Sequence, residues 1–197
     1  MFVEKIEKTK KGTYKVTIDG SEYLFSEDTI VMYRLAKGHE TTLSEVNQAK
    51  RTEELQGFYS KALSYALRYG KSEARIRDYL VEKGCPYSSI NPIIERLKEN
   101  KVINDLVLID SLISSLSRKG NGKLLIKEKL YQKGFSKYDI DERLDLMDMD
   151  EYKEGLLKLY QKVCHKYDKY ESFIRNEKLK SYLLRRGYTY LEISFLF

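Results

Sequence analysis

Three glycines, Gly84, Gly134 and Gly187, stand in the same sequence context, 50 and then 53 residues apart. Eight positions before each glycine is an aliphatic residue, four before it a leucine, immediately before it a basic residue, and six after it an isoleucine. The residues in these columns are Ile76, Ile126 and Leu179; Leu80, Leu130 and Leu183; Lys83, Lys133 and Arg186; and Ile90, Ile140 and Ile193. Four columns that match across three copies indicate an internal repeat.

The spacing inside the repeat predicts helices. Residues four apart share one helix face, so each copy begins with a short helix that buries two aliphatic side chains. The glycine ends that helix in the left-handed conformation, and a second helix anchored by the isoleucine follows. A longer helix precedes each copy, over residues 54–69, 105–118 and 150–170. We therefore expect three tandem three-helix repeats over residues 51–102, 103–148 and 149–197, the third one short, stacked neighbour on neighbour.

The first fifty residues predict a small β-meander and a helix. Tyr14, Val16 and Ile18 alternate with polar residues, as in a half-buried strand, and Asp19-Gly20 suits a tight hairpin turn. Further expected features are a strand from Phe2 to Lys8, a loose turn at Lys10-Lys11-Gly12, and a helix from Glu27 to Ala36 capped by Ser26. The fold class is therefore mainly α, with tandem three-helix repeats behind a small N-terminal β-meander plus helix over residues 1–50.

Two further signals concern helix starts. Thr42 with Glu45 fits a capping box that opens the next helical stretch. In the last helix of the first repeat, which carries Ile90, Ile93, Ile94 and Leu97, Pro92 is expected in the first turn, where a missing N–H costs nothing.

Composition restricts the environment of the chain. No stretch approaches the roughly 18 apolar residues that span a bilayer, and the first residues lack the apolar run of a signal peptide. The two cysteines, Cys85 and Cys164, stand in unrelated contexts, which makes a disulfide framework improbable and a reducing compartment the default. We expect a cytoplasmic protein without a membrane partner.

Catalytic and metal-binding patterns are missing from the sequence. The two histidines are His39 and His165, and Cys164 shares an apolar helical stripe, which predicts packing rather than nucleophilic chemistry. Gly120-Asn121-Gly122-Lys123 resembles a phosphate loop, but Ser117 and Leu124 stand where the Walker pattern needs glycine and serine or threonine. A structural zinc site needs about four clustered ligands. We expect no enzyme activity, no metal and no cofactor.

Basic residues offer the candidate contact sites. The net charge of +6 all lies after residue 50, where a phosphate-contacting face could form. One candidate group flanks the glycine turn and consists of Arg118, Lys119, Lys123 and Lys127, of which the last two are expected to share an outward stripe. A second group is Arg68, Lys71, Arg75 and Arg77. The alternative for both is a solvated face without a ligand. Arg185-Arg186 beside Tyr188 and Tyr190 could stack on bases, although packing is the favoured role of these tyrosines.

Several of these segments together resemble the RecX family of recombinase regulators. The stretch from Ser72-Glu73 to Lys83-Gly84 is similar to a family signature, and Ile103-Asn104-Asp105 resembles the start of the family's second unit. Gly120-Asn121-Gly122, followed by Ile126, Leu130, Lys133 and Gly134, resembles a second signature. The N-terminal sheet with Glu27–Val31 looks like the extension of RecX proteins from low-GC Gram-positive bacteria. Gly70 and Asn104 depart from the pattern, and the third repeat is the most divergent.

The resemblance implies a regulatory function. RecX proteins bind the filament that the RecA recombinase forms on single-stranded DNA, and they restrain filament growth, ATP hydrolysis and strand exchange in DNA repair and the SOS response. The implied partners are the RecA filament and single-stranded DNA, contacted directly or through the filament, and we expect a monomer. The alternative is an autonomous DNA-binding protein of the helix-turn-helix kind. Against it, no helix carries a dense set of Arg, Asn and Gln on one base-reading face.

Overall fold

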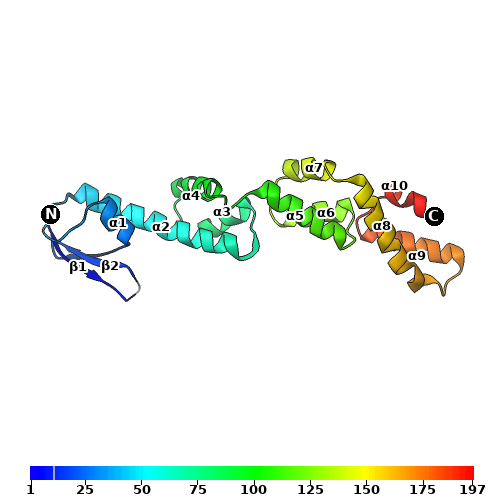
Figure 1. The fold of residues 1–197 in the computed structure, drawn as a ribbon, viewed down its shortest axis with the longest axis horizontal. Coiled ribbons are helices and arrows are strands. Elements are labelled where there is room, and N and C mark those ends of the chain that lie inside the picture. The colour runs from blue at the N-terminus through cyan, green and yellow to red at the C-terminus, as the bar shows by residue number, and fades with distance from the viewer. Residues whose placement is uncertain (11) are drawn as a thin grey trace. The chain divides into compact units, whose positions relative to one another are not determined.

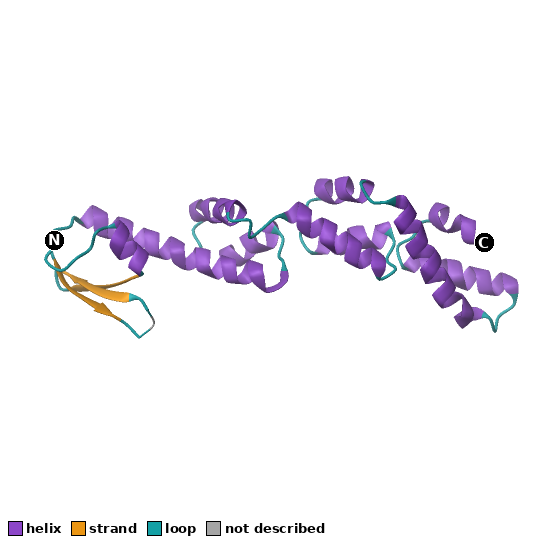
Figure 2. Ribbon diagram, viewed as in Figure 1, coloured by secondary structure: helices purple, strands orange, loops and turns teal. Residues whose placement is uncertain are grey.

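The structure, a computed structural model, describes residues 1–10 and 12–197 apart from the side chain of Tyr69. The described chain is mainly helical, with one small sheet near its N-terminus, which confirms the expected fold class (Figures 1 and 2). The strands are β1 (Val3–Lys8), β2 (Tyr14–Ile18) and β3 (Ser21–Phe25). The helices are α1 (Glu27–Met32), α2 (Leu43–Tyr69), α3 (Glu73–Glu82), α4 (Tyr87–Glu99), α5 (Asp105–Arg118), α6 (Lys123–Gln132), α7 (Lys137–Asp145), α8 (Met149–Cys164), α9 (Ser172–Arg185) and α10 (Tyr190–Ile193).

The chain forms two compact units. Unit 1 comprises residues 1–64 and 80–95, and unit 2 comprises residues 65–79 and 96–197. Helices α2, α3 and α4 contribute residues to both units. The expected domain boundary after residue 50 falls inside α2, which runs without interruption from Leu43 to Tyr69. The division into ranges 51–102, 103–148 and 149–197 stays a prediction.

Unit 1 contains the antiparallel sheet, in the order β1-β2-β3. Asp19 and Gly20 both have positive φ, 42° and 73°, as the predicted hairpin turn requires. The apolar face of the sheet packs with α2 in one core, which consists of Val3, Val16, Ile18, Phe25, Leu35, Val46 and Ala49. The loose turn predicted at Lys10-Lys11-Gly12 includes Lys11, which lies outside the described residues.

A carboxylate holds α1 against α2. One oxygen of Glu53 accepts hydrogen bonds from the Ser26 amide at 2.7 Å, the Ser26 hydroxyl at 2.9 Å and the Thr29 hydroxyl at 2.7 Å. The expected extent of α1 was wrong, because the helix ends at Met32 rather than Ala36. Arg34 has a φ of 52°, and this left-handed residue turns the chain away from the helix axis.

The helix starts agree with the sequence in one case and differ in another. The capping box at Thr42 and Glu45 forms, with hydrogen bonds of 2.8 and 3.2 Å. Helix α4, however, begins at Tyr87, so Pro92 lies inside the helix and not in its first turn. Pro92 is exposed, and its missing N–H removes one hydrogen bond from the ladder.

The repeat pattern corresponds to the same local structure in all three copies. Gly84, Gly134 and Gly187 have φ of 77°, 85° and 86°, which confirms the left-handed helix ends. The leucines four positions earlier are fully buried, and they are Leu80, Leu130 and Leu183. The long helix before the third glycine is shorter than the expected 150–170, because α8 ends at Cys164 and a 3-10 turn follows at His165–Tyr167.

Unit 2 contains two successive helical groups. The group α5–α7 packs around Ile109, Ile113, Ile126, Leu130, Phe135, Ile140 and Leu144. The group α8–α10 packs around Tyr152, Leu156, Leu183, Tyr188 and Ile193. Helix α10 starts with a complete capping box between Thr189 and Glu192. Unit 2 has two junctions. One joins residues 65–79 to the group α5–α7, and the other joins the group α5–α7 to the group α8–α10.

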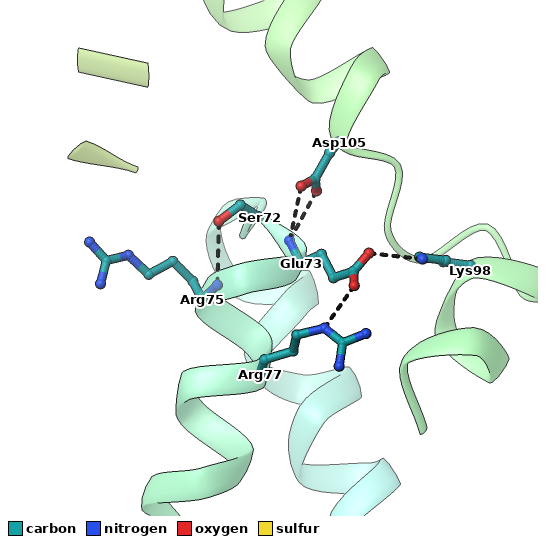
Figure 3. A network of polar contacts seen from close by, with 6 residues as sticks. All are labelled: Ser72, Glu73, Arg75, Arg77, Lys98 and Asp105. Atoms are coloured by element: carbon teal, nitrogen blue, oxygen red, sulfur yellow. Dashed lines mark hydrogen bonds and ion pairs between the residues drawn. The ribbon is translucent and has the colours of Figure 1, made fainter. Parts of the chain in front are cut away.

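The first junction joins residues 65–79 to the group α5–α7. The Ser72 hydroxyl donates to the Lys133 carbonyl at 2.7 Å, and Nη2 of Arg75 donates to the Gln132 carbonyl at 2.8 Å. The Asp105 carboxylate accepts the Glu73 amide at 3.0 and 3.2 Å, which caps the start of α3 from the first residue of α5 (Figure 3). Side chains therefore make the first junction.

The second junction joins the group α5–α7 to the group α8–α10 and uses the backbone. The Gly122 amide donates to the Arg186 carbonyl at 2.7 Å, and the Leu124 amide donates to the Gly187 carbonyl at 3.1 Å. The hydroxyl of Tyr152 accepts the Lys123 amide at 3.0 Å. Gly122 stands twelve positions before Gly134, as Ser72 stands twelve before Gly84, so the two junctions use equivalent positions of the repeat.

Candidate functional site: two groups of basic residues

The first predicted group, Arg68, Lys71, Arg75 and Arg77, does not form a single cluster. Arg68 is exposed near the end of α2, whereas Lys71 lies in the turn before α3. The Lys71 ammonium lies 5.2 Å from the centre of the Tyr65 ring, which stacks on Tyr79 with 4.1 Å between ring centres. The turn therefore presents a lysine held beside a rigid aromatic pair.

Arg75 and Arg77 point to different sides of α3. Figure 3 shows Arg77 directed toward Glu73 and Lys98, and Arg75 directed away from them. Nε of Arg77 lies 2.7 Å from one Glu73 oxygen, and the Lys98 ammonium lies 2.8 Å from the other. Arg77 is therefore part of an ion-pair network. Arg75 lies on the other side of α3, away from that network.

The carboxylates of this network have shifted pKa values. Burial raises the pKa of Glu73, but the bonds to Lys98 and Arg77 outweigh burial, so the pKa lies below its ordinary value of 4.5. Burial raises the pKa of Asp105, and the hydrogen bond from the Glu73 amide only partly offsets that effect. The network thus holds Glu73 ionised as a partner of two cations.

A basic residue that sequence reasoning missed lies near Arg75. Lys133, at the end of α6, lines the same cavity of about 310 Å³ as Lys71 and Arg75. The repeat pattern already contained Lys133 as the basic residue before a glycine. Its approach to residues of the preceding repeat could not be read from the sequence, because it depends on how the repeats stack.

In the second predicted group, Arg118 and Lys119 are exposed at the end of α5. Arg186 fixes the turn that follows them, because Nε donates to the Gly120 carbonyl at 2.9 Å and Nη2 donates to the Lys119 carbonyl. Both residues border a groove of about 460 Å³. Charged residues from α8 that also line this groove are Glu151, Glu154, Lys158 and Lys162. The sequence had not singled out these lysines of α8.

Lys123 and Lys127 differ from the expectation of an outward stripe. Both are half-buried, and Lys127 forms an ion pair with Asp141 of α7. The Lys123 ammonium lies 5.7 Å from the centre of the Tyr152 ring. Since Asp141 of α7 and Tyr152 partly cover these lysines, they face solvent only in part, and contact of these lysines with a partner stays a prediction.

The stacking surface considered around Arg185-Arg186 does not form as a unit. Tyr188 is only 2% exposed, and burial raises its pKa to about 12. Arg186 is engaged with the carbonyls of Lys119 and Gly120, whereas Arg185 and Tyr190 are exposed. Packing, the favoured role, is therefore correct for Tyr188.

Cys164 and His165 each contact a residue of their own helical segment. Cys164 is buried, and its thiol donates to the Gln161 carbonyl at 3.2 Å. His165 is exposed and lies 3.1 Å from an Asp168 oxygen.

Within residues 1–10 and 12–197, no helix combines the length and apolar character needed to cross a bilayer.

Comparison with known proteins gives one consistent result. A family model described as "RecX, third three-helix domain" matches residues 150–195. The regulatory protein RecX of Streptococcus sanguinis (strain SK36) is 34% identical over 198 residues, which cover 96% of this chain and 73% of the relative. That of Streptococcus mutans serotype c is 31% identical over 195 residues, 98% of this chain and 74% of the relative.

Solved structures show the same fold. A crystal structure of a regulatory protein RecX superimposes with a TM-score of 0.78 at 25% identity, covering 98% of this chain and 97% of the other. The crystal structure of RecX from Lactobacillus salivarius gives a TM-score of 0.68 at 23% identity over 73% of this chain and 94% of the other. With relatives above 30% identity along nearly its whole length, the chain belongs to the RecX family of regulatory proteins.

Proposed function

We propose that this protein binds the RecA filament on single-stranded DNA and restrains ATP hydrolysis and strand exchange in DNA repair and the SOS response. Membership of a family whose relatives are named regulatory proteins is the observation that carries the proposal. We further propose that the protein acts as a cytoplasmic monomer and without catalysis of its own.

The exposed cations of unit 2 support contact with a polyanion. Arg118 and Lys119 lie on a turn that Arg186 holds in place, and Lys133 lies beside Lys71 and Arg75 in a second position. A filament on single-stranded DNA presents phosphates that such side chains neutralise with release of counterions. A turn whose backbone is already held in place reduces the entropy lost on binding.

The test is the DNA-dependent ATPase of RecA, assayed with increasing amounts of this protein. We expect slower hydrolysis at amounts well below one protein per RecA, because restraint of filament growth requires few molecules. The Arg118→Gln/Lys119→Gln variant should inhibit less than the parent. Hydrolysis that is unchanged at equimolar protein contradicts the proposal, and sequence-specific binding to duplex DNA without RecA would favour an autonomous DNA-binding protein.

A further inference from the structure

The cavity at the first junction brings together cations from two repeats. Its lining consists of Tyr65, Gly70, Lys71, Ser72 and Arg75 from one side and Gln132, Lys133 and Phe135 from the other. Among the described residues that line it there is no aspartate or glutamate. Three basic side chains therefore face a cavity of about 310 Å³, which is within the usual size range of ligand pockets.

Arg75 is fixed in this cavity without losing its charge. Nη2 donates to the Gln132 carbonyl at 2.8 Å, and a neutral carbonyl orients a guanidinium but does not neutralise it. The nearest carboxylate to the guanidinium is Asp78, whose Oδ2 lies 3.8 Å from Nη1, and that pair is half-exposed and weak. The guanidinium thus stands ready as a donor to an anion.

Local contacts connect the segments that carry the cations of the cavity. The Ser72 hydroxyl binds the Lys133 carbonyl at 2.7 Å, so the backbone that carries Lys133 is attached to the start of α3. Lys71 is held beside the stacked pair of Tyr65 and Tyr79. A ligand would therefore meet cations whose backbones are already fixed to one another, which lowers the cost of binding.

We propose that this junction cavity binds a phosphate group, and that its source is the backbone of single-stranded nucleic acid. Consecutive phosphates along a strand match three clustered cations better than the isolated carboxylate of a protein side chain, because every nucleotide carries one negative charge. The contacts go to phosphate and not to base edges, so binding is independent of sequence. This inference rests on the proposed function, in which single-stranded DNA is part of the partner.

The test uses the full chain and a fluorescently labelled oligo-dT, with affinity measured at several salt concentrations. Lys133→Gln removes one cavity cation, and Lys137→Gln is the matched control, since Lys137 is an exposed lysine at the start of α7 outside the cavity. We expect Lys133→Gln to weaken binding and to flatten the slope of log affinity against log salt by about 0.7. Lys137→Gln should leave the slope at the parent value. Equal slopes in the two variants, both folded by thermal unfolding, overturn the phosphate site.

Two further arms separate the source of the phosphate from other acidic partners. Inorganic phosphate should shift the amide resonances of Lys71 and Ser72 in the parent, and oligo-dT should shift the same resonances at far lower concentration. Phosphate shifts without any effect of Lys133→Gln on oligo-dT binding would identify a free-phosphate site and overturn the nucleic-acid source. Displacement of oligo-dT by oligoglutamate at equal charge concentration would indicate an acidic protein partner instead.

The RecA assay distinguishes failure of this inference from failure of the proposed function. If the parent slows RecA hydrolysis and Lys133→Gln binds oligo-dT like Lys137→Gln, the function stands and the phosphate site falls. If the parent leaves RecA unaffected while Lys133→Gln alone flattens the salt slope, the phosphate site stands and the proposed function falls.

Discussion

Gly122 and Gly187 approach so closely that a Cβ atom on Gly122 would lie 2.3 Å from the carbonyl carbon of Gly187. No real Cβ contact is that short, and the neighbouring atoms belong to the backbone, which cannot turn aside as a flexible side chain does. The close approach allows the Gly122 amide to reach the Arg186 carbonyl at 2.7 Å. Glycine at position 122 is therefore required by space, since its own φ of −77° suits any residue.

The first prediction tests this requirement. Gly122→Ala should reduce the free energy of unfolding by about 1–3 kcal/mol or more, because overpacking forces the two helical groups apart. Gly84→Ala is the comparison, since Gly84 has φ of 77° but an added Cβ would meet nothing within 4 Å. Gly84→Ala should reduce the free energy of unfolding only by the cost of placing alanine in the left-handed conformation, about 1–2 kcal/mol. Urea unfolding measures both, and a Gly122→Ala protein as stable as the parent would show that the junction is looser than described.

The second prediction concerns the buried leucines of the repeat. Leu130 is fully buried in the core of α5–α7, so Leu130→Ala should cost about 2–5 kcal/mol of unfolding free energy. Leu124 lies on the same helix but is 56% exposed, and Leu124→Ala should change stability by less than about 0.5 kcal/mol. Chemical denaturation of both variants gives the comparison. Similar losses in the two would refute the assignment of Leu130 to the core.

The third prediction separates contact residues from structural ones. Arg118→Glu/Lys119→Glu should weaken binding to the RecA filament while stability changes by less than about 0.5 kcal/mol, because both side chains are exposed. Lys127→Glu should instead lower stability, because the new carboxylate would face Asp141. Filament binding and thermal unfolding are measured on each variant. Unchanged binding by the folded Arg118→Glu/Lys119→Glu protein would leave these residues as a solvated face.

The fourth prediction concerns pH. Since the pKa of Glu73 is lower in the folded protein than its ordinary 4.5, the ionised carboxylate stabilises the fold above that pH and loses the effect as pH falls through the folded pKa. The difference in unfolding free energy between parent and Glu73→Gln should therefore be largest near neutral pH and shrink in acid. Asp105, whose pKa is also shifted, is present in both proteins, so the comparison isolates the contribution of Glu73. Glu82→Gln, at the exposed end of α3, is the control, and a Glu73 difference that does not vary with pH would contradict the ion-pair network.

Much of the fold follows from local sequence. The repeat was visible because Leu80, Leu130 and Leu183 must be buried at one spacing from a left-handed glycine, a constraint that acts within a few residues. The end of α1 was not visible, because a left-handed Arg34 is a rare choice for a residue with a Cβ. The sequence also contains no clear boundary between the helical stretch that the capping box opens and the long helix of the first repeat. In the structure both belong to α2, which runs from Leu43 to Tyr69.

The candidate site was harder to predict. Nearness of Lys133 to Arg75, of Asp141 to Lys127 and of Arg186 to the Lys119 carbonyl depends on which surfaces of neighbouring helices meet. Charge along the sequence showed only which segments are rich in basic residues. It could not tell that Lys98 is paired with Glu73 or that Lys123 lies beside Tyr152, because those partners come from separate helices.

Because only glycine fits at position 122, the three copies cannot exchange places in the chain. Ser72 is the equivalent residue of the preceding copy, and it meets Lys133 through its hydroxyl with room for a Cβ. If recombination within the gene excised one copy in frame, for example residues 84–133, Ser72 would be brought against Gly187, where even a methyl group does not fit. Each surviving copy would keep its own core, yet the new boundary would clash. The copies therefore cannot be shuffled or shortened by whole units, although they share one pattern, unless the boundary residues change as well.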